Sequence, residues 1–318
     1  MSQGLLAIDI GGTKLAAGIV TMEGSVVSRA RQPTPPNGDA EAIYAALLAS
    51  VSAAIADDGA GYQIRGIGIG SGGPMRAREG LVSPLNTPGW RDFPLVARLR
   101  DDLGITAVLD NDAKAFALGE YRYGAGQGHP DMMGVVVSTG VGGGIINAGT
   151  LLHGRTLNGG HVGHLVAEPN GPRCACGGRG CVEAIASGPS IVRLVRAELE
   201  RGRESALQEV PPATITAQDV ARAAREGDEL SVQGFERAGR ALGIGFAGAA
   251  ALLDFDLIVV GGGVSNTGEL LMAPLRRTLA EHAALDYIRG QVRVVPSANA
   301  QDAGLIGAAA LALAGREG

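Results

Sequence analysis

All three cysteines of the chain lie within eight residues, close to two of its five histidines. His164, Cys174, Cys176 and Cys181 have the spacing H-x9-C-x-C-x4-C, and His161 lies three residues before His164. Three thiols and an imidazole suit tetrahedral zinc, and the interspersed glycines allow the loop to curl around an ion. Because four protein ligands would close the site, the sequence predicts a structural zinc ion. Buried free cysteines or a redox pair are the alternatives.

Two glycine-rich turns form a second group of candidates. The stretch "DIGGTK" covers Asp9 to Lys14, and "STGVGGG" covers Ser138 to Gly144. Glycines let the backbone approach an anion closely, and hydroxyl and N–H groups then donate to phosphate oxygens. Each turn by itself is also compatible with a plain hairpin. A carboxylate such as Asp9, at the end of a buried strand, needs a cation or donors, and hydrated Mg²⁺ meets that need.

The stretch "LDNDAKAF" places Asn111 and Asp112 where a predicted strand meets a predicted helix. Asp is a favoured N-cap, so a purely structural role for Asp112 is one interpretation. A carboxylate at a strand's end also points into the crevice where α/β proteins bind ligands. There Asp112 can accept a proton from a sugar hydroxyl as that hydroxyl attacks a phosphoryl group. Asn111 offers both a donor and an acceptor to a hydroxyl.

The elements that must position these residues alternate between strands and helices. A strand–glycine turn–strand module occurs twice, at residues 5–20 and 134–150, and each copy is followed by further strands and helices. Apolar spacing favours helices over 39–58, 187–203 and 216–252. The pattern predicts an α/β protein with two related domains flanking a cleft. We expect a smaller domain at 1–115, with the C-terminal helix 302–318 packing back on it, and a larger domain at 116–301 carrying the cysteine loop.

A third glycine turn lies in the second half of the chain. The stretch "VVGGGVSN" covers Val259 to Asn266 and follows an apolar strand. It either approaches the adenosine or phosphate of a nucleotide or is a simple strand-to-helix loop.

Composition narrows the classes of partner. The chain has 318 residues, 46% of them hydrophobic, and a formal net charge of -5, without the basic run that a nucleic-acid partner requires. The N-terminus enters a strand pattern directly, and the longest apolar run is too short to span a bilayer. Crowded cysteines of odd number favour reduced thiols over disulfides. We therefore expect a cytoplasmic protein with no membrane association.

Four segments together resemble the ROK family of bacterial sugar kinases and sugar-responsive repressors. They are "AIDIGGTKLAAGIV", "LDNDAKAFALGEYRYGAG", "VVVSTGVGGGIINAGTLLHG" and "GHVGHLVAEPNGPRCACGGRGCVEAIASG". The resemblance implies two actin-like ATPase (ribonuclease H-like) domains and ATP-dependent phosphorylation of a sugar 6-hydroxyl. It also implies Mg²⁺, structural Zn²⁺ and a homodimer.

The resemblance also assigns roles to individual residues. For ATP it implies a first phosphate turn (Asp9, Gly11, Gly12, Thr13, Lys14), a second (Thr139, Gly140, Gly142, Gly143) and an adenosine turn (Gly261, Gly262, Gly263). For the sugar it implies Gly73, Asn86, Asn111, Asp112, His164 and Glu183. Asp112 would be the catalytic base. His164 would place one ring nitrogen on zinc and offer the other to a sugar hydroxyl, so that the metal fixes its orientation.

The chain departs from the family's common Glu-x-Gly-His motif, because His161 stands where the glutamate is usual. Glutamate accepts from two sugar hydroxyls, whereas a neutral histidine accepts one hydrogen bond and donates one. The Gly-His-x-Gly-His version resembles bacterial N-acetylmannosamine kinases. We therefore expect His161 to contact the sugar and N-acetylmannosamine to be the favoured substrate over glucose or N-acetylglucosamine. Alternatively, His161 merely packs and glucose is the substrate.

Two other classes of function are considered. A sugar-sensing ROK repressor would carry an N-terminal helix-turn-helix, yet the first phosphate strand begins by about residue 5. A catalytically dead sugar-binding protein is disfavoured because Asp9 and Asp112 are both present.

Overall fold

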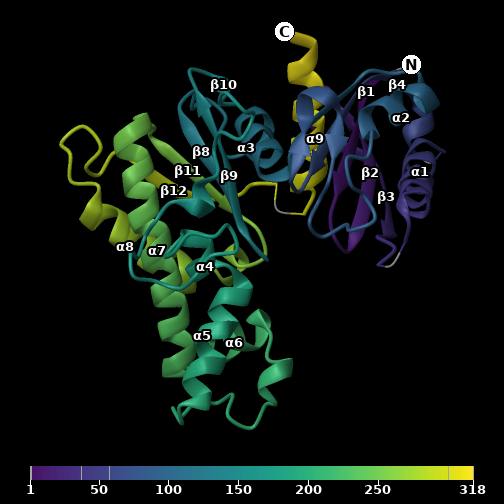
Figure 1. Cartoon of the computed structure of the whole chain (residues 1–318). Helices are drawn as coiled ribbons and strands as arrows, with labels where there is room; N and C mark the ends of the chain where they lie inside the picture. The colour runs from purple at the N-terminus through teal and green to yellow at the C-terminus, as the bar shows by residue number, and fades with distance from the viewer. Residues whose placement is uncertain (1, 37, 57, 300, 318) are drawn as a thin grey trace. The chain divides into compact units, whose positions relative to one another are not determined.

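The computed structural model describes residues 2–36, 38–56, 58–299 and 301–317 of a mixed α/β protein (Figure 1). The chain forms two compact units. Unit 1 comprises Met1–Gly128, Gly154–Leu157 and Ala298–Gly318, and unit 2 comprises His129–His153 and Asn158–Ser297. Residue 115, the boundary expected from the sequence, lies inside helix α3 (Asp112–Tyr123), all of which belongs to unit 1.

Unit 1 is built on a five-stranded sheet with the order β3-β2-β1-β4-β7. Its strands are β1(Ser2–Ile10), β2(Lys14–Thr21), β3(Val26–Pro33), β4(Tyr62–Ser71) and β7(Ala107–Asn111). Strands β1, β2 and β3 pair antiparallel, while β4 is parallel to both β1 and β7. A small ribbon of β5(Met75–Arg76) and β6(Leu81–Val82) and two short 3-10 helices, η1(Asp58–Gly61) and η2(Ala77–Glu79), lie in the connections.

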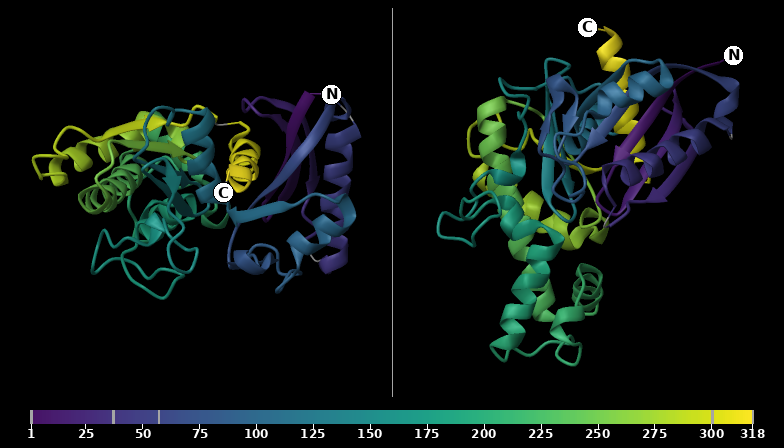
Figure 2. Two further views of the ribbon diagram at one scale, coloured as in Figure 1. Left: turned by 90° about the horizontal axis from the view of Figure 1, so that it is seen from above. Right: turned by 45° about the vertical axis from the view of Figure 1, so that its right-hand side comes forward.

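The alternation of side chains along β1 explains why both faces of this sheet are covered. Leu6 and Ile8 belong to the core under α1(Ala40–Ala56) and α2(Leu95–Leu103), whereas Leu5 and Ala7 pack against α9(Ala303–Glu317). Figure 2 shows α9 on one side of the sheet and α1 on the other. The expected packing of the last helix on the N-terminal sheet is therefore present. The expected helix after Asp39 is α1, and Asp39 accepts a hydrogen bond from the Ala42 N–H at 2.8 Å.

Unit 2 repeats this topology. Its sheet has the order β10-β9-β8-β11-β12, formed by β8(Met132–Val137), β9(Val141–Asn147), β10(Thr150–Leu151), β11(Leu257–Gly261) and β12(Arg293–Pro296). As in unit 1, three strands form an antiparallel meander and two further strands are parallel to its first strand. The two predicted strand–turn–strand modules are β1–β2 and β8–β9, so the structure confirms the repeat seen in the sequence.

The helices of unit 2 are α4(Val182–Ala186), α5(Gly188–Glu200), α6(Ala217–Arg225), α7(Glu229–Leu253) and α8(Glu269–His282). Short 3-10 helices are η3(Val162–His164), η4(Pro212–Thr214) and η5(Ser265–Thr267). The helical region expected over 216–252 consists of two helices: α6 ends before Gly227, which has a φ of 93°, and Asp228 caps α7 by accepting from the Ser231 N–H at 2.8 Å. The long α7 packs closely on α8, because a Cβ on Gly239 would lie 2.6 Å from Pro274 Cγ.

Helix α3 fixes the segments by which the chain leaves and re-enters unit 1. Glu120 is only 1% exposed, and its carboxylate accepts from the N–H groups of Ala125 at 2.9 Å, Ala298 at 3.3 Å and Asn299 at 3.2 Å. These acceptor bonds satisfy a buried negative charge. No helix in the described part of the chain has the length and apolar character needed to cross a membrane.

Candidate functional site

The first glycine turn is held by hydrogen bonds from two directions. Within the turn, Gly11 N–H donates to the Lys14 carbonyl at 3.0 Å. From the end of β3, the Thr34 hydroxyl donates to the Gly11 carbonyl at 2.8 Å, and Thr34 N–H donates to the Thr13 carbonyl at 3.1 Å. Because the Gly11 N–H is used within the turn, Gly12 and Thr13 carry the N–H groups that are the candidates to donate to an anion.

The first turn lies against a predicted sugar-binding residue. A Cβ placed on Gly12 would lie 2.4 Å from the Cβ of Asn86, so only glycine allows this approach. The neighbouring Leu85 N–H donates to the Gly73 carbonyl at 3.1 Å. The fold of unit 1 therefore brings together Gly12, Gly73 and Asn86, which are widely spaced in the sequence.

Asp9 lies beside the start of helix α9. A Cβ on Gly304 would lie 2.5 Å from Asp9 Oδ2, so the carboxylate occupies the space that a side chain at position 304 would fill. Burial, with a further contribution from Asp112, raises the pKa of Asp9 to about 6, although Lys14 and Arg31 act in the opposite direction. Binding of a cation would stabilise the ionised form of this desolvated carboxylate. The positive end of the α9 dipole also favours the ionised form.

Asp9→Asn is expected to stabilise the ligand-free protein at pH 7.5. The folded-state pKa of about 6 exceeds the ordinary 3.8, so the folded protein binds more protons within this window and its stability falls as the pH rises through it. Removing the charge should recover up to about 3 kcal/mol, which corresponds to a rise in Tm of several degrees. Thermal unfolding at pH 4 and pH 7.5 measures this, and a lower Tm for the variant at pH 7.5 would contradict it.

Gly304→Ala is expected to displace the Asp9 carboxylate without unfolding unit 1. The added methyl would lie 2.5 Å from Asp9 Oδ2, and the carboxylate must move to avoid it. A displacement on the order of 1 Å at a reacting site lowers rates by about 10²-fold. Gly248→Ala in α7 is the matched control, because nothing lies within 4 Å of a Cβ there. Equal turnover rates of the Gly304→Ala and Gly248→Ala variants would show that turnover does not depend on the position of the Asp9 carboxylate.

Asn111 and Asp112 form the junction of β7 and α3. Asn111 is the N-cap of α3, and its side chain accepts from the Ala113 N–H at 3.1 Å. Asp112 Oδ1 also accepts from this N–H at 2.8 Å, and the side chain is accessible to solvent. The pKa of Asp112 is raised, because desolvation by surrounding protein atoms outweighs the effect of the hydrogen bond from Ala113. A raised pKa makes a carboxylate a better proton acceptor near neutral pH.

The second glycine turn is tied to helix α4 by Glu183. Ser138 N–H donates to the Gly140 carbonyl at 2.8 Å, which closes the turn around Thr139. Glu183 Oε2 accepts from the Val141 N–H at 3.0 Å and lies 2.7 Å from the position of a Cβ on Gly140. A predicted sugar-binding carboxylate is thus in direct contact with a predicted phosphate turn.

The turn that carries the two histidines packs on strand β9. A Cβ on Gly143 would lie 2.7 Å from Val162 Cγ2, and a Cβ on Gly163 would lie 1.8 Å from the Val141 carbonyl oxygen. His161 and His164 flank Val162 and Gly163, and their ring centroids are 6.1 Å apart. The His161 side chain is exposed. The glycines therefore set the close approach of the histidine turn to the start of β9.

The third glycine turn lies next to the second. Val264 N–H donates to the Val137 carbonyl at 3.0 Å, and Gly262, with a φ of 95°, packs so closely that a Cβ would lie 2.5 Å from the same oxygen. Gly263 approaches the Ser138 hydroxyl, 3.8 Å from the position of its Cβ. Gly261 is the last residue of β11. The two turns thus form one glycine-rich edge of the unit 2 sheet.

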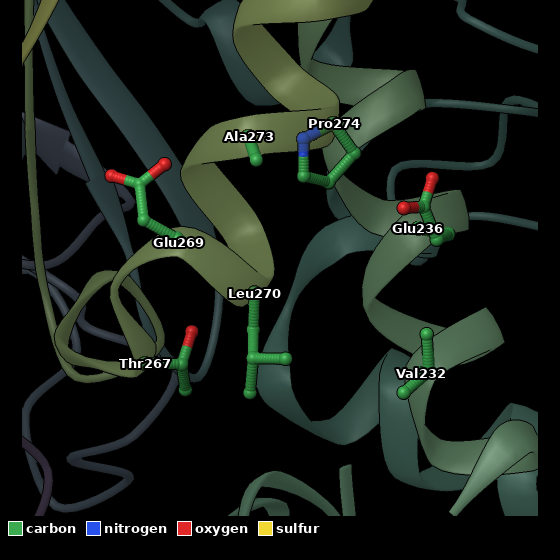
Figure 3. A pocket seen from close by; sticks show the side chains of 7 residues that line it. All are labelled: Val232, Glu236, Thr267, Glu269, Leu270, Ala273 and Pro274. Carbon is green, nitrogen blue, oxygen red and sulfur yellow. The ribbon is translucent and has the colours of Figure 1, made fainter. Parts of the chain in front are cut away.

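A pocket of about 380 Å³ lies beyond the third turn, between α7 and α8. Figure 3 shows α7 side chains on one side of it and α8 side chains on the other, with Thr267 of η5 at the lower left. Its lining is mostly apolar, with one hydroxyl and two carboxylates at the edges: Val232, Glu236, Thr267, Glu269, Leu270, Ala273 and Pro274. Such a lining suits a flat, partly polar ring system.

The four predicted metal ligands converge. One ligand atom from each of His164, Cys174, Cys176 and Cys181 lies within 4.8 Å of all the others. His164 Nδ1 is 3.8 Å from Cys174 Sγ, and the sulfurs of Cys176 and Cys181 are 3.7 Å apart. A tetrahedron with Zn–S bonds of 2.3 Å has edges of about 3.8 Å, so this donor set fits zinc.

The electrostatics of the cluster also favour a cation. Burial, followed by the neighbouring thiols, raises the pKa of Cys181. Thiols crowded in this way require a cation to ionise together at neutral pH.

The loop that carries the cluster is held to α7 by a bidentate ion pair. Arg237 Nε and Nη2 donate to the two Glu168 oxygens at 3.0 and 2.7 Å.

Several supporting residues were not anticipated from the sequence. Three contacts bring together elements that are distant in the chain. They are those of Thr34 with Gly11, of Gly304 with Asp9 and of Glu183 with Val141. Lys114 could have been singled out from the sequence, because it is one of only two lysines and lies among apolar residues of a predicted helix. In the structure it is buried.

The comparison with protein families decides the classification. A model described as "ROK family" matches residues 5–314. The chain belongs to the ROK family. This ROK protein is 38% identical over 309 residues to an N-acetylmannosamine kinase of Shigella flexneri, covering 97% of this chain and 98% of the relative. It is 34% identical over 311 residues to a glucokinase of Thermotoga maritima, with 96% of each covered.

The solved structures agree with this classification. A ROK family glucokinase from Streptomyces griseus, in complex with glucose and AMPPNP, superposes with a TM-score of 0.83 at 36% identity. The match covers 99% of this chain and 100% of that one. The two five-stranded sheets with their helices are accordingly those of the actin-like ATPase fold, as expected from the sequence.

Proposed function

We propose that this ROK protein is an ATP-dependent sugar kinase that phosphorylates the 6-hydroxyl of an N-acetylhexosamine, with N-acetylmannosamine favoured and glucose or N-acetylglucosamine as the alternatives. The observation that carries the proposal is the position of Asp112, a solvent-accessible carboxylate at the end of β7 with a raised pKa. The relatives, named glucokinase and N-acetylmannosamine kinase, support the reaction class.

In this proposal the residues of unit 1 perform the proton transfer and bind phosphate. Asp112 accepts the proton from the 6-hydroxyl, which increases the electron density on the attacking oxygen. Asn111, Asn86 and Gly73 hold neighbouring hydroxyls. The first turn, from Gly11 through Gly12 and Thr13 to Lys14, binds phosphate oxygens. Mg²⁺, when bound, neutralises charge on the transferred phosphoryl group, and Asp9 is the carboxylate that fits it.

The residues of unit 2 bind the rest of the nucleotide. The second turn, with Thr139, Gly140, Gly142 and Gly143, offers N–H and hydroxyl donors to phosphate. The third turn, Gly261 to Gly263, lies beside it and leads to the pocket between α7 and α8. We assign this pocket to adenosine, because Leu270 and Pro274 supply apolar contact while Glu236 and Thr267 can hydrogen-bond a base or ribose.

The proposed zinc site orients a sugar-binding imidazole. His164 Nδ1 is the nitrogen beside Cys174, so Nε2 remains for a sugar hydroxyl. A metal-bound Nδ1 fixes both the tautomer and the ring orientation. Glu183 Oε2 accepts from the Val141 N–H, so Oε1 accepts a hydrogen bond from a further sugar hydroxyl.

His161 supports the choice of an N-acetylhexosamine. Its exposed ring, 6.1 Å from that of His164, can donate one hydrogen bond and accept another. A glutamate at this position would only accept. An acyl carbonyl requires a donor, which the imidazole supplies and the carboxylate does not.

The test is a coupled kinase assay of glucose, N-acetylglucosamine and N-acetylmannosamine with ATP, using the wild type and His161→Glu. We expect the wild type to have its highest kcat/KM with N-acetylmannosamine and the variant to shift toward glucose. A site built to hydrogen-bond a substrate group rejects an analogue lacking that group by up to about 10⁴-fold. No phosphorylation of any of the three sugars would reject the proposal and favour a sugar-sensing role.

The resemblance to the ROK family further implies a homodimer in the cytoplasm, where thiols stay reduced and ATP is present. We retain both as part of the proposal. Light scattering after size-exclusion chromatography tests the first.

A further inference from the structure

Lys114 is a fully buried charge that the proposed reaction does not use. Its exposed fraction is 0%, and its Nζ donates to Asp110 Oδ1 at 2.8 Å and Oδ2 at 2.7 Å. Asp110, 4% exposed, also accepts from the Asn111 N–H at 2.7 Å. Asp110 and Lys114 therefore bracket Asp112 and fix the turn from β7 into α3.

The same ammonium group holds a segment far along the chain. Lys114 Nζ donates to the Leu157 carbonyl at 3.2 Å. Leu157 belongs to a short stretch, Gly154–Leu157, that is part of unit 1 although the residues on both sides of it belong to unit 2. Leu157 has a φ of 62°, a left-handed conformation that leucine rarely adopts. Such a conformation persists only where the surroundings impose it.

Both ends of this hydrogen bond lie close in the sequence to predicted site residues. Lys114 is two residues after Asp112, and Leu157 is four residues before His161. Gly160, just before His161, is itself fixed on β9, since its Cβ would lie 3.1 Å from the Gly143 carbonyl oxygen. Only Asn158 and Gly159 lie between Leu157 and Gly160 in the chain.

We propose that Lys114 is a positioning residue whose hydrogen bond to the Leu157 carbonyl ties the approach to the histidine turn to the helix that begins at the catalytic base. This inference rests on the proposed sugar-kinase function. It requires that loss of the donor at position 114 impair sugar use while leaving ATP binding unchanged.

Single substitutions at this pair are poor tests, because removing one partner leaves a buried unpaired charge. Two uncharged double variants avoid this: Asp110→Asn/Lys114→Gln, which keeps a donor at position 114, and Asp110→Asn/Lys114→Met, which has none. Each is compared with the wild type in kcat, in KM for sugar and in KM for ATP. Hydrogen exchange of residues 156–160 reports on the link independently of catalysis.

We expect the Gln variant to retain kcat/KM for sugar within about threefold and the Met variant to lose about tenfold or more, with equal KM for ATP. Amides of 156–160 should exchange faster in the Met variant alone. Equal sugar kinetics and equal exchange in the two variants would overturn the inference. If the Met variant does not fold, Asp110→Asn/Lys114→Leu, which also lacks a donor at position 114, takes its place: a loss of kcat/KM for sugar of about tenfold or more supports the link, and kinetics equal to those of the Gln variant overturn it.

These outcomes separate the inference from the function on which it rests. A wild type that phosphorylates no sugar rejects the kinase proposal, and the exchange measurement still determines whether Lys114 holds residues 156–160.

Discussion

Asp112→Asn is expected to lower kcat for sugar phosphorylation by about 10²- to 10⁴-fold, the contribution typical of a positioned general base. Asparagine keeps the shape of the side chain and can still accept from the Ala113 N–H, which Asp112 does at 2.8 Å. It cannot take up the proton of the 6-hydroxyl. KM for the sugar should therefore change by less than about threefold, since the lost interaction exists only in the transition state.

Asp101→Asn is a matched control for this change, because Asp101 is an exposed carboxylate on α2 of the same unit. Its kcat should equal that of the wild type. Steady-state kinetics with saturating ATP measure both variants, and thermal unfolding checks that they are folded. An Asp112→Asn enzyme that retains a substantial fraction of the wild-type rate would exclude Asp112 as the base.

In the proposed kinase, the two glycine turns give one repeated scaffold two kinds of phosphate contact. Both follow the first strand of a five-stranded sheet of the same order, and both precede an antiparallel partner. In unit 1 the strand ends in Asp9, whose raised pKa favours a bound cation. In unit 2 the corresponding strand leads into Ser138 and Thr139, neutral donors, while Glu183 binds the turn from outside. The repeated topology gives the two turns similar backbone positions, and the different side chains determine whether a turn suits a cation or an anion.

What the sequence predicts well here is local. The repeated module, the helix expected over 39–58 and the convergence of His164 with the three cysteines depend on spacing within one element or one loop. Contacts between elements were not predictable in this way. That Gly12 packs on Asn86 and that Gly304 lies beside Asp9 follows only once β1, the 72–94 segment and α9 are placed together. The helical region expected over 216–252 divides into α6 and α7 at Gly227, which has a positive φ, and at Asp228, which caps α7.

Zinc removal is the second change with a large expected effect. We expect wild-type protein to contain one zinc ion per chain and Cys176→Ser to contain little or none, because a serine hydroxyl replaces a thiolate in a closed tetrahedral set. His164 Nδ1 would then lose the partner that fixes its ring, and Nε2 its direction toward the sugar. KM for the sugar should rise by about 10- to 100-fold, the range seen when the groups orienting a metal-bound histidine are lost. KM for ATP should change far less.

The control for Cys176→Ser is Arg173→Ser, which introduces the same side chain at an exposed position of the same loop. Metal analysis of both purified variants and of the wild type, with sugar kinetics on each, separates loss of the ion from disturbance of the loop. Readdition of zinc after chelation should restore the wild type and the Arg173 variant but not the Cys176 variant. A wild type without zinc that binds sugar normally would mean that the thiols serve another purpose. The orientation of His164 would then have to come from the packing of its turn on β9.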